Sequence, residues 1–426
     1  MTAIVEGASK IGGTIIAPPS KSYTHRAFII ASLARGDSVI SSPLLAEDTL
    51  STLNAMRAFG VKIEESESVL IHGCDGGLTT PTGEVDCGNS GTTIRLVSGV
   101  AALDGTAVLT GDESLKRRPM QPLLDALNQL GVKAFSKGNG TPPVVIEGSG
   151  IKGGSVDIRG DISSQFISSI LIASPYAKDD VKININTPLK SKPYVYMTLD
   201  IMEKFGVEAQ GNLNSLIIKA RQSYRGRRYS VEGDYSSASY FFALAALTFS
   251  EVTVQNLNRE SKQADKLILD ILKDMGAKVT VKDGEVTVRG NGLSGIEVDL
   301  GDAPDLLPTV AALGCRARGE TVIRNVGHVR FKETDRLSAC AKEYKKFGVS
   351  INEYNDGVKI KGAGKLKGSN VKSYGDHRMV MALAILGASA EGKTVIDDAR
   401  CISISFPGFF ETLGQIGVKV NISGGN

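Results

Sequence analysis

A short signature recurs six times along the chain and constrains its fold more than any other feature. Each copy ends a stretch of helical periodicity with a glycine, after which apolar and polar residues alternate. The six glycines lie 69 to 75 residues apart: Gly60, Gly131, Gly206, Gly276, Gly348 and Gly417. Glycine readily adopts the left-handed conformation that ends many helices. The spacing therefore predicts six copies of one structural unit.

The neighbouring elements recur in the same register as the glycines. In every copy a helix of small apolar residues comes first, a strand follows it, and a second helix runs up to the glycine. The strands are expected at residues 37–40, 106–109, 181–184, 251–254, 320–323 and 393–396. One unit is therefore β-α-β-α-β-β, and six units in 426 residues predict two domains of three units. The predicted fold class is α/β, with buried helices inside and sheets outside.

The register also predicts where the chain passes between the two domains. The sixth unit stops short of its last strand, whereas residues 3–7 indicate a strand with no helix before it. We therefore expect the N-terminal segment to complete the C-terminal domain. One domain would comprise residues 14–230 and the other residues 1–13 plus 231–426. Two crossings would make a two-strand hinge, with the active site in the cleft between the domains.

Composition argues against several classes of protein. The 49 basic and 46 acidic residues leave a net charge of +3, and there is no tryptophan, so nucleic acid is not an expected partner. No apolar run approaches the roughly 18 residues of a membrane span, and the N-terminus lacks the apolar core of a signal peptide. The cysteines are scattered without a CxxC pair, which indicates reduced thiols in a cytoplasmic protein and no metal site. They are Cys74, Cys87, Cys315, Cys340 and Cys401.

Two glycine-rich stretches, 148–153 and 290–295, match the dinucleotide-binding pattern GxGxxG. Both lie at a predicted turn between strands, whereas that fingerprint requires a strand, a turn and a helix. A third stretch, 88–93, lacks the lysine of a P-loop. None of the three is expected to bind a nucleotide.

Polar residues collect where the first helix of each unit is expected to begin. The first cluster, Ser20-Lys21-Ser22, follows two prolines and precedes an apolar helical run, with hydroxyls available to cap it. The others are Asn89-Ser90-Gly91-Thr92, Ser163-Ser164-Gln165, Asp234-Tyr235-Ser236-Ser237, Ala303-Pro304-Asp305 and Asp376-His377-Arg378. Capping alone could explain such residues, and it is the favoured interpretation for Asp234. Converging helix N-termini would, however, also create an electropositive pocket.

Charged residues collect a second time, in the loop after the middle strand of several units. These loops span residues 116–119, 190–194 and 329–336. A surface of ion pairs is the alternative, but recurrence at one structural position favours a site. The candidate site holds the cations Lys21, Arg26, Arg118, Lys332, Arg336 and Arg378 against the carboxylates Asp305 and Glu333. This excess of cations suits substrates that bear phosphate and carboxylate groups.

Eight motifs carry a resemblance to a known family. They are Ser20-Lys21-Ser22 with Arg26, Gly88-Asn89-Ser90-Gly91-Thr92, Leu109-Thr110-Gly111 with Arg118-Pro119, Ser163-Ser164-Gln165-Phe166, Ser191-Lys192-Pro193-Tyr194, Val231-Glu232-Gly233-Asp234, Lys332-Glu333-Thr334-Asp335-Arg336-Leu337 and Asp376-His377-Arg378-Met379. Over essentially its whole length the chain resembles the 3-phosphoshikimate 1-carboxyvinyltransferases, or 5-enolpyruvylshikimate-3-phosphate (EPSP) synthases, of the enolpyruvyl transferase family. The resemblance implies two inside-out α/β-prism domains of three βαβαββ units each.

The resemblance also implies a reaction of the shikimate pathway, which leads to chorismate and the aromatic amino acids. The enolpyruvyl group of phosphoenolpyruvate passes to the 5-hydroxyl of shikimate 3-phosphate, and phosphate is released, by addition and elimination through a tetrahedral intermediate. Asp305 is the implied proton acceptor from the 5-hydroxyl, Glu333 the implied partner in methylene protonation, and Lys21 a contact of both substrates. No metal or organic cofactor is implied, and the family is usually monomeric.

The remaining implied contacts follow from the same motifs. Those to shikimate 3-phosphate are Lys21, Ser22, Arg26, Ser163, Ser164, Gln165, Ser191, Asp305, His328 and Lys332. Those to phosphoenolpyruvate are Lys21, Asn89, Gly91, Arg118, Gln165, Arg336 and Arg378.

The chain departs from the family pattern at two positions. Ile404 replaces a lysine that contacts phosphoenolpyruvate in some members, so Arg400 or another cation substitutes for it or the contact is dispensable. His328 replaces an asparagine and can still donate to a phosphate. Gly91 matches members that bind the herbicide glyphosate at the phosphoenolpyruvate site, which motivates the hypothesis that this chain binds it too.

Two other functions are considered. The sister transferase that acts on UDP-N-acetylglucosamine carries a reactive cysteine in the loop that here spans residues 112–118, where no cysteine is present. A non-catalytic scaffold that binds anions would keep the cations but would not need Asp305 and Glu333.

Overall fold

The structure is a computed structural model that describes residues 1–8 and 10–424. The chain divides into two compact units. The N-terminal unit is Pro19–Val231, and the C-terminal unit combines Met1–Pro18 with Glu232–Asn426. Each unit contains three four-stranded sheets, so the described chain has the six sheets that the repeat predicts.

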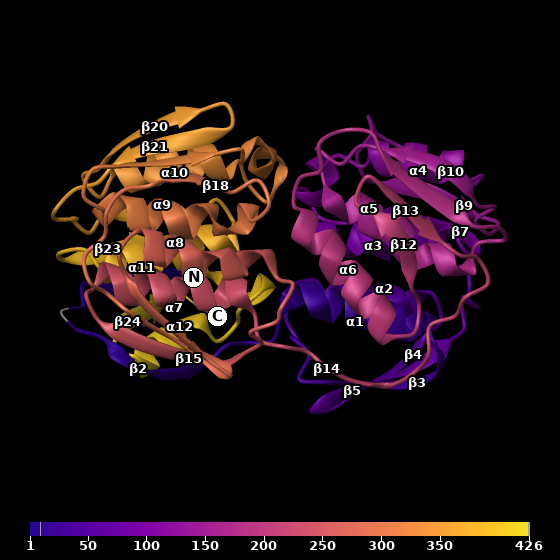
Figure 1. Ribbon diagram of the computed structural model, residues 1–426, viewed down its shortest axis with the longest axis horizontal. Helices are drawn as coiled ribbons and strands as arrows, with labels where there is room; N and C mark the ends of the chain where they lie inside the picture. Colours follow the sequence, from indigo (N-terminus) through magenta and orange to yellow (C-terminus); the bar gives the residue numbers. More distant parts are fainter. Residues whose placement is uncertain (9, 425–426) are drawn as a thin grey trace. The chain divides into compact units, whose positions relative to one another are not determined.

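The N-terminal unit contains three copies of the βαβαββ repeat (Figure 1). Its helices are α1 (Lys21–Leu33), α2 (Glu47–Ala58), α3 (Gly91–Ala101), α4 (Gln121–Gln129), α5 (Ser164–Ala173) and α6 (Lys192–Lys204). Its strands are β3 (Arg35–Ser41), β4 (Lys62–Glu65), β5 (Ser68–Cys74), β6 (Val85–Asp86), β7 (Gly105–Thr110), β8 (Lys133–Ser136), β9 (Val144–Gly148), β10 (Gly154–Ile158), β11 (Val181–Ile185), β12 (Ala209–Asn212), β13 (Ser215–Ile218) and β14 (Arg228–Ser230). The sheet orders are β14-β3-β5-β4, β6-β7-β9-β8 and β10-β11-β13-β12.

The C-terminal unit repeats this arrangement with the last strand of its third sheet taken from the start of the chain. Its helices are α7 (Tyr235–Leu247), α8 (Ile268–Asp274), α9 (Leu307–Arg316), α10 (Arg336–Lys345), α11 (His377–Ala388) and α12 (Phe409–Gln415). Its strands are β1 (Thr2–Glu6), β2 (Gly12–Ile16), β15 (Glu251–Leu257), β16 (Lys278–Lys282), β17 (Gly284–Arg289), β18 (Glu297–Asp299), β19 (Glu320–Arg324), β20 (Ser350–Tyr354), β21 (Gly357–Lys361), β22 (Asn370–Val371), β23 (Lys393–Ile396) and β24 (Val420–Ser423). The sheet orders are β16-β17-β15-β2, β18-β19-β21-β20 and β22-β23-β1-β24.

Strand pairing explains how the chain passes between the units. β1 pairs antiparallel with both β23 and β24, so the N-terminal segment supplies a strand to a C-terminal sheet. β2 pairs in parallel with β15, and this pairing keeps residues 14–16 in the C-terminal unit. The first boundary therefore lies between Pro18 and Pro19 and not at the predicted 13/14 position, and the second lies between Val231 and Glu232. β14 then pairs with β3 and closes the first sheet of the N-terminal unit.

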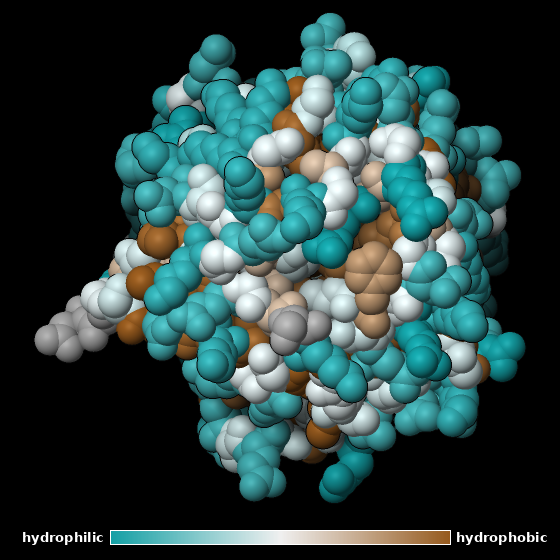
Figure 2. Space-filling view, turned by 90° about the vertical axis from the view of Figure 1, so that its left-hand side faces the viewer, coloured by the Kyte–Doolittle hydropathy of each residue, from teal (hydrophilic) through white to brown (hydrophobic). Residues whose placement is uncertain are grey.

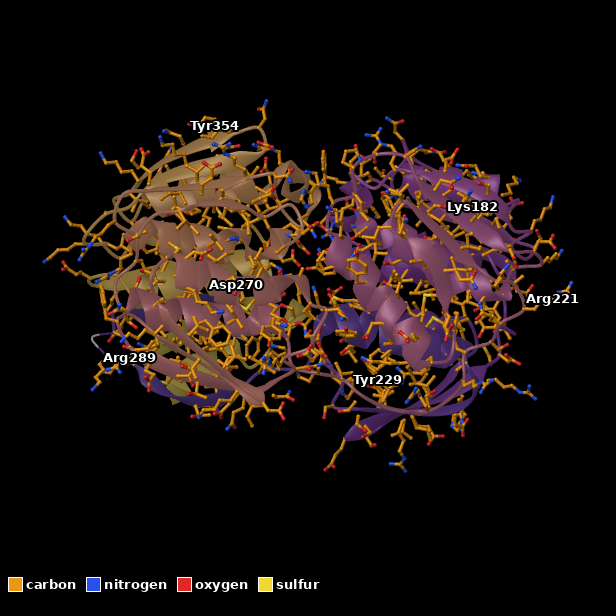
Figure 3. All side chains as sticks on the ribbon, in the orientation of Figure 1. Lys182, Arg221, Tyr229, Asp270, Arg289 and Tyr354 are labelled. Atoms are coloured by element: carbon orange, nitrogen blue, oxygen red, sulfur yellow. The ribbon has the colours of Figure 1, made fainter. Side chains whose placement is uncertain are left out.

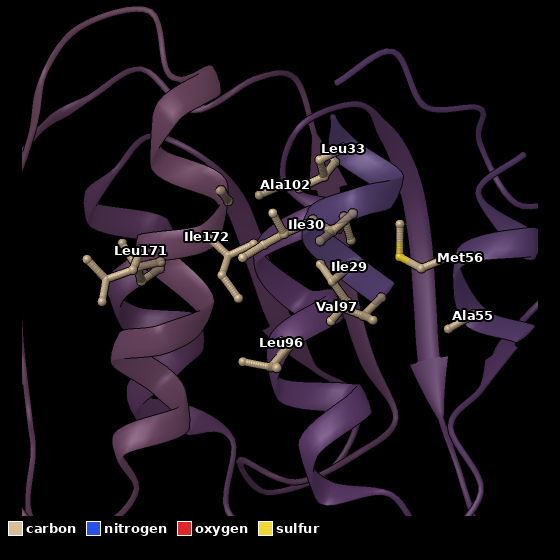
Figure 4. Close-up of a cluster of buried hydrophobic side chains, with 14 of the residues drawn as sticks. Ile29, Ile30, Leu33, Ala55, Met56, Leu96, Val97, Ala102, Leu171 and Ile172 are labelled. Atoms are coloured by element: carbon tan, nitrogen blue, oxygen red, sulfur yellow. The ribbon is translucent and has the colours of Figure 1, made fainter. Parts of the chain in front are cut away.

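Three helices of each unit are buried on all sides and form its core. In the N-terminal unit these are α1, α3 and α5, and Figure 4 shows side chains such as Ile29, Leu96 and Ile172 packed between them. In the C-terminal unit every residue of α7 and of α11 is buried, and α9 packs against both helices. Each such Leu or Ile contributes about 1.5–3 kcal/mol by leaving water. The prediction of inner helices and outer sheets is confirmed.

The outer faces of the sheets are polar because their strands alternate between core and solvent. On β11 the burial pattern alternates, and Lys182 points away from the core (Figure 3). Arg289 at the end of β17 and Tyr354 at the end of β20 are also exposed. Figure 2 shows mostly hydrophilic residues on one face of the molecule, with apolar residues scattered among them. Among the described helices, none has the length and apolarity needed to cross a membrane.

All six signature glycines have positive φ angles, between +84° and +105°. Each follows the second helix of its repeat, and this conformation lets the chain turn back into a strand. The two GxGxxG stretches lie between strands, as predicted: β9 ends at Gly148 and β10 begins at Gly154, while the second follows β17. Neither opens a helix.

Substitution of a signature glycine should destabilise its unit through backbone strain alone. Gly417 has a φ of +97° and a side chain there would meet only Lys10 O at 3.8 Å, so Gly417→Ala should lower the free energy of unfolding by about 1–2 kcal/mol. Gly414 lies in α12 in open space, and Gly414→Ala should be neutral or stabilising by up to about 1 kcal/mol. Urea unfolding of both variants measures the difference, and equal stabilities would contradict the backbone explanation.

Candidate active site

The inner helices begin with polar residues, and four of them are capped by a side chain. Ser90 accepts a hydrogen bond from Thr93 N, and Asp376 accepts one from Arg378 N. Ser163 and Asp234 cap α5 and α7 in the same way. The expected hydroxyl cap of α1 is wrong, because Ser20 is the N-cap residue but its Oγ has no hydrogen-bond partner among the described residues.

Lys21, the first residue of α1, is paired with a carboxylate that sequence reasoning missed. Its Nζ lies 2.7 Å from Oδ2 of Asp48, and the two side chains are 14% and 7% exposed. Burial alone would raise the pKa of Asp48, but Lys21 and His25 outweigh it and hold that pKa well below its usual value. The only signal in the sequence was an acidic residue in the first turn of α2, where acids commonly stabilise a helix.

Arg26 is a buried cation that ties α1 to α6. Its Nε donates to Thr198 Oγ1 at 2.7 Å, and its two terminal nitrogens donate to the carbonyl oxygens of Ser22 at 2.9 Å and Tyr194 at 3.2 Å. Burial lowers the pKa of Arg26 to about 10, so the guanidinium remains charged at neutral pH. Ser191, the N-cap residue of α6, is also buried and has a left-handed backbone with φ 55°.

At the start of α3 an arginine packs directly against a glycine. Arg118 is 6% exposed, and its Nη2 donates to Asn89 Oδ1 at 2.7 Å. A Cβ atom on Gly91 would lie 2.7 Å from Arg118 Nη1, closer than real contacts allow. Arg118 thus lies against two other residues predicted to bind phosphoenolpyruvate.

Gln165 connects the starts of α3 and α5. Its Oε1 accepts from Arg95 Nη1 at 2.8 Å, and its Nε2 donates to Thr92 Oγ1 at 2.9 Å. Arg95 also lies over the ring of Phe166, at 5.4 Å from the ring centre. Sequence reasoning missed Arg95, although a cation inside an otherwise apolar helix was a usable signal.

In the C-terminal unit, Arg336 is surrounded by three carboxylates. It is 1% exposed and donates to Asp376 Oδ2 at 2.7 Å, to Asp305 Oδ1 at 2.8 Å and to Glu333 Oε2 at 2.5 Å. Burial alone would lower its pKa, but the carboxylates, above all Asp376, raise it well above the usual value. The guanidinium therefore stays charged and keeps all three carboxylates oriented.

Asp305 is held by cations from several elements. Besides Arg336 on α10, it accepts a hydrogen bond from Arg378 Nη2 of α11 at 2.8 Å, and Lys332 Nζ lies 3.6 Å away. Asp305 lies in the short helix η4 (Pro304–Leu306), just before α9. The structure therefore brings together the predicted Asp305, Lys332, Glu333, Arg336 and Arg378.

Two further acids in this cluster were not predicted as site residues. Asp376, which the sequence suggested only as part of a motif, is fully buried and both caps α11 and binds Arg336. Asp265 lies in η3 (Ala264–Leu267) and accepts a hydrogen bond from Ser236. Burial, with help from nearby Asp305, raises the pKa of Asp265 to about 7.

The two positions that depart from the family pattern lie in short helices. His328 lies in the short helix η5 (Gly327–Phe331), and this helix ends directly before Lys332. Ile404 ends η6 (Ala399–Ile404) and is buried, whereas Arg400 of the same helix is exposed. No group of three or more His, Cys, Asp or Glu with the geometry of a metal site occurs in the described part of the chain.

Comparison with known proteins identifies the family. Residues 5–413 match the family model described as EPSP synthase (3-phosphoshikimate 1-carboxyvinyltransferase). The chain belongs to the EPSP synthase family. It is 51% identical to the 3-phosphoshikimate 1-carboxyvinyltransferase of Methanothermobacter thermautotrophicus over 99% of this chain and 100% of that one. The enzyme of the same name from Methanococcus aeolicus is 48% identical over 98% and 99% of the two chains.

A solved EPSP synthase has the same fold. The structure of EPSP synthase from Acinetobacter baumannii superimposes with a TM-score of 0.84 at 29% identity, covering 99% of this chain and 100% of that one. The resemblance drawn from the eight motifs is therefore confirmed. The match favours EPSP synthase over the sister transferase specific for UDP-N-acetylglucosamine and over a non-catalytic scaffold.

The Asp376–Arg336 ion pair should be a large contributor to the stability of this EPSP synthase family member. Asp376→Ala would leave a buried guanidinium short of one partner and remove a helix cap, so it should cost about 3–5 kcal/mol. Asp335→Ala removes the cap of α10 and a partly exposed contact to Arg330, and it should cost only about 1 kcal/mol. Urea unfolding distinguishes the two, and similar losses would mean that the buried pair is not stabilising.

Proposed function

We propose that the chain transfers the enolpyruvyl group of phosphoenolpyruvate to the 5-hydroxyl of shikimate 3-phosphate and releases phosphate. The observation that carries this proposal is the cluster around Arg336. In this cluster Asp305 lies beside the cations Lys332 and Arg378, and Glu333 lies beside Arg336 itself. A scaffold that only binds anions has no use for carboxylates among its cations, whereas a reaction with two proton transfers requires them.

The residues proposed to bind phosphoenolpyruvate offer an ammonium group, guanidinium groups and amides. They are Lys21, Asn89, Gly91, Arg118, Gln165, Arg336 and Arg378. Support comes from the contact of Arg118 with Asn89 and with the start of α3, since helix N-termini and arginine forks both suit phosphate and carboxylate. Ile404 leaves no cation at the position where some members have lysine, so the three arginines would supply the charge.

The residues proposed to bind shikimate 3-phosphate are richer in hydroxyl groups. They are Lys21, Ser22, Arg26, Ser163, Ser164, Gln165, Ser191, Asp305, His328 and Lys332. These residues, like those for phosphoenolpyruvate, are contributed by both units. Arg26 also fixes the backbone near this proposed site, because its guanidinium donates to the carbonyl oxygens of Ser22 and of Tyr194 at the start of α6.

The proposed chemistry assigns one carboxylate to each proton transfer. In the addition, the oxygen of the 5-hydroxyl bonds to C2 of phosphoenolpyruvate while Asp305 accepts the hydroxyl proton. Glu333 delivers a proton to C3. In the elimination, the Glu333 carboxylate takes back a proton from C3, the C2–C3 double bond re-forms and the C2–O bond to phosphate breaks, and Asp305 returns its proton to the departing phosphate. Lys21 and the arginines stabilise the phosphate as it leaves. Arg336 contacts both carboxylates and so keeps them oriented throughout.

We further propose that the protein acts as a monomer in the cytoplasm. All five cysteines are free thiols, and three of them are buried, which fits a reducing compartment. Gel filtration with light scattering should give the mass of a single chain.

An assay of phosphate release tests the function directly. The purified protein should release phosphate when both phosphoenolpyruvate and shikimate 3-phosphate are present, and not with either alone. Lys21→Met removes the proposed shared cation and should lower kcat by at least about a hundredfold while leaving the fold intact, although the loss of the partner of buried Asp48 should lower the free energy of unfolding. Release only with UDP-N-acetylglucosamine would reject the function, and near-normal kcat in Lys21→Met would reject its role.

The contact between Gly91 and Arg118 predicts a selective binding defect. Gly91→Ala would push the guanidinium away from the start of α3, so the KM for phosphoenolpyruvate should rise about tenfold while the KM for shikimate 3-phosphate changes little. Gly83→Ala, at a glycine of ordinary backbone angle where an added Cβ has nothing within 4 Å, serves as the control. Glyphosate should compete with phosphoenolpyruvate in the wild type and less in Gly91→Ala. An equal rise in both KM values would argue against this placement of phosphoenolpyruvate.

A further inference from the structure

A buried path of hydrogen-bonded side chains connects α1 to the first turn of α3. His25 on α1 is completely buried, and its Nδ1 lies 2.7 Å from Oγ1 of Thr52 on α2. Thr52 Oγ1 lies 2.6 Å from Oγ1 of Thr93, which lies 2.7 Å from Oγ of Ser90. Ser90 is the N-cap residue of α3 and directly precedes Gly91. Four side chains from three helices thus form one continuous path within the N-terminal unit.

The other ring nitrogen of His25 faces the partner of Lys21. Nε2 lies 3.6 Å from Asp48 Oδ2, the same oxygen that lies 2.7 Å from Lys21 Nζ. Neither His25 Nε2 nor Asp48 Oδ1 has a hydrogen-bond partner among the described residues, although both atoms are buried. Buried polar atoms without a partner are costly, so a small movement that joins these two groups would be favourable.

The carboxylate of Asp48 determines which nitrogen of His25 carries the proton. Burial lowers the pKa of His25, although Asp48 opposes this, so the ring is neutral at pH 7 and has a single N–H. An unprotonated Nε2 would place its lone pair next to a lone pair of the Asp48 carboxylate, and the two would repel each other. We therefore assign the proton to Nε2. Nδ1 then accepts a hydrogen bond from the Thr52 hydroxyl, and the Thr93 hydroxyl donates to Oγ of Ser90, the N-cap residue of α3.

We propose that His25 is a positioning residue for Lys21. Its Nε2–H holds Asp48 while Lys21 turns toward phosphate and carboxylate ligands, and its Nδ1 couples that carboxylate to the start of α3 through Thr52. This inference rests on the role proposed above for Lys21. Without His25, Asp48 would lose one of the two groups that keep it ionised and in place, and Lys21 would lose a fixed partner.

The charged groups that face His25 come from two helices. Asp48 on α2 favours a charged ring, whereas Lys21 and Arg26 on α1 oppose it, and α3 presents the neutral hydroxyl of Thr93. Loss of the Nε2–H contact would remove one of the two partners that keep the pKa of Asp48 low. The pKa of Asp48 would then rise, and its ionised form would be lost at a higher pH on acidification.

Two substitutions separate positioning from packing. His25→Leu preserves approximate size but donates nothing, whereas the amide of His25→Gln can still donate to Asp48 and accept from Thr52. We expect kcat/KM for phosphoenolpyruvate to fall about tenfold or more in His25→Leu, as for a lost hydrogen bond to a charged group. We also expect the acidic limb of its pH profile of kcat/KM to move to higher pH. His25→Gln should recover most of the activity and the original limb. If His25→Leu does not fold, His25→Asn, too short to reach Asp48, should show the shifted limb.

A double-mutant cycle tests whether His25 acts through Asp48. In an Asp48→Asn background, His25→Leu should cause little further loss. An equal loss in both backgrounds, or an acidic limb that coincides with that of the wild type in His25→Leu, would overturn the proposal. His72→Gln is the matched control, because His72 contacts Asp37 and Glu64 on an exposed sheet face. This variant should leave kcat/KM and its pH dependence unchanged.

The outcomes also distinguish this inference from the proposed function. A wild-type protein that releases no phosphate refutes the function itself. A wild-type protein that turns over, together with an active Lys21→Met, refutes the role of Lys21 and with it the positioning role. An active wild type, an inactive Lys21→Met and a fully active His25→Leu refute only the role of His25.

Discussion

A helix that is apolar on every side can meet water only at its ends, and this constraint organises both units. All residues of α7 and α11 are buried, and α1, α3, α5 and α9 are buried along most of their length. Many of their polar residues therefore lie in or next to the first turn, where unpaired backbone N–H groups and the helix dipole attract anions. Inner helices surrounded by sheets and an anion-binding region at the helix starts are thus two consequences of one burial pattern.

Cations at these helix starts are held by carboxylates, and this pairing determines what can bind there. Lys21 forms an ion pair with Asp48, and Arg336 forms ion pairs with Asp305, Glu333 and Asp376. The pairs hold the cations in fixed directions and avoid the cost of burying an unpaired charge. An anionic substrate must share or displace one of these partners, so a ligand with two or more negative charges is favoured over one with a single charge.

Much of the fold could be predicted from the sequence because its signals are local and repeated. Gly131 and Gly348, for example, end helices at the predicted points, and the strand at residues 3–7 lies in the predicted sheet. The boundary at 13/14 was wrong because only the pairing of β2 with β15 fixes it, and pairing depends on residues far apart in the chain. Asp48 and Asp265 were missed for a related reason: each looks like an ordinary helical residue until its partners on another helix are known.

The two units use the same scaffold for different chemistry. At the helix starts of the N-terminal unit the polar groups are mostly hydroxyls and amides, such as Ser90, Thr93 and Gln165, which suit the recognition of a hydroxylated, phosphorylated ring. The helix starts of the C-terminal unit carry carboxylates interleaved with arginines, which suit proton transfer near developing charge. Asp265 strengthens this contrast, since its pKa of about 7 lets it carry a proton beside Asp305 at neutral pH. The same repeat thus carries different polar groups at equivalent helix starts in the two units, while the buried faces of its helices are apolar in both.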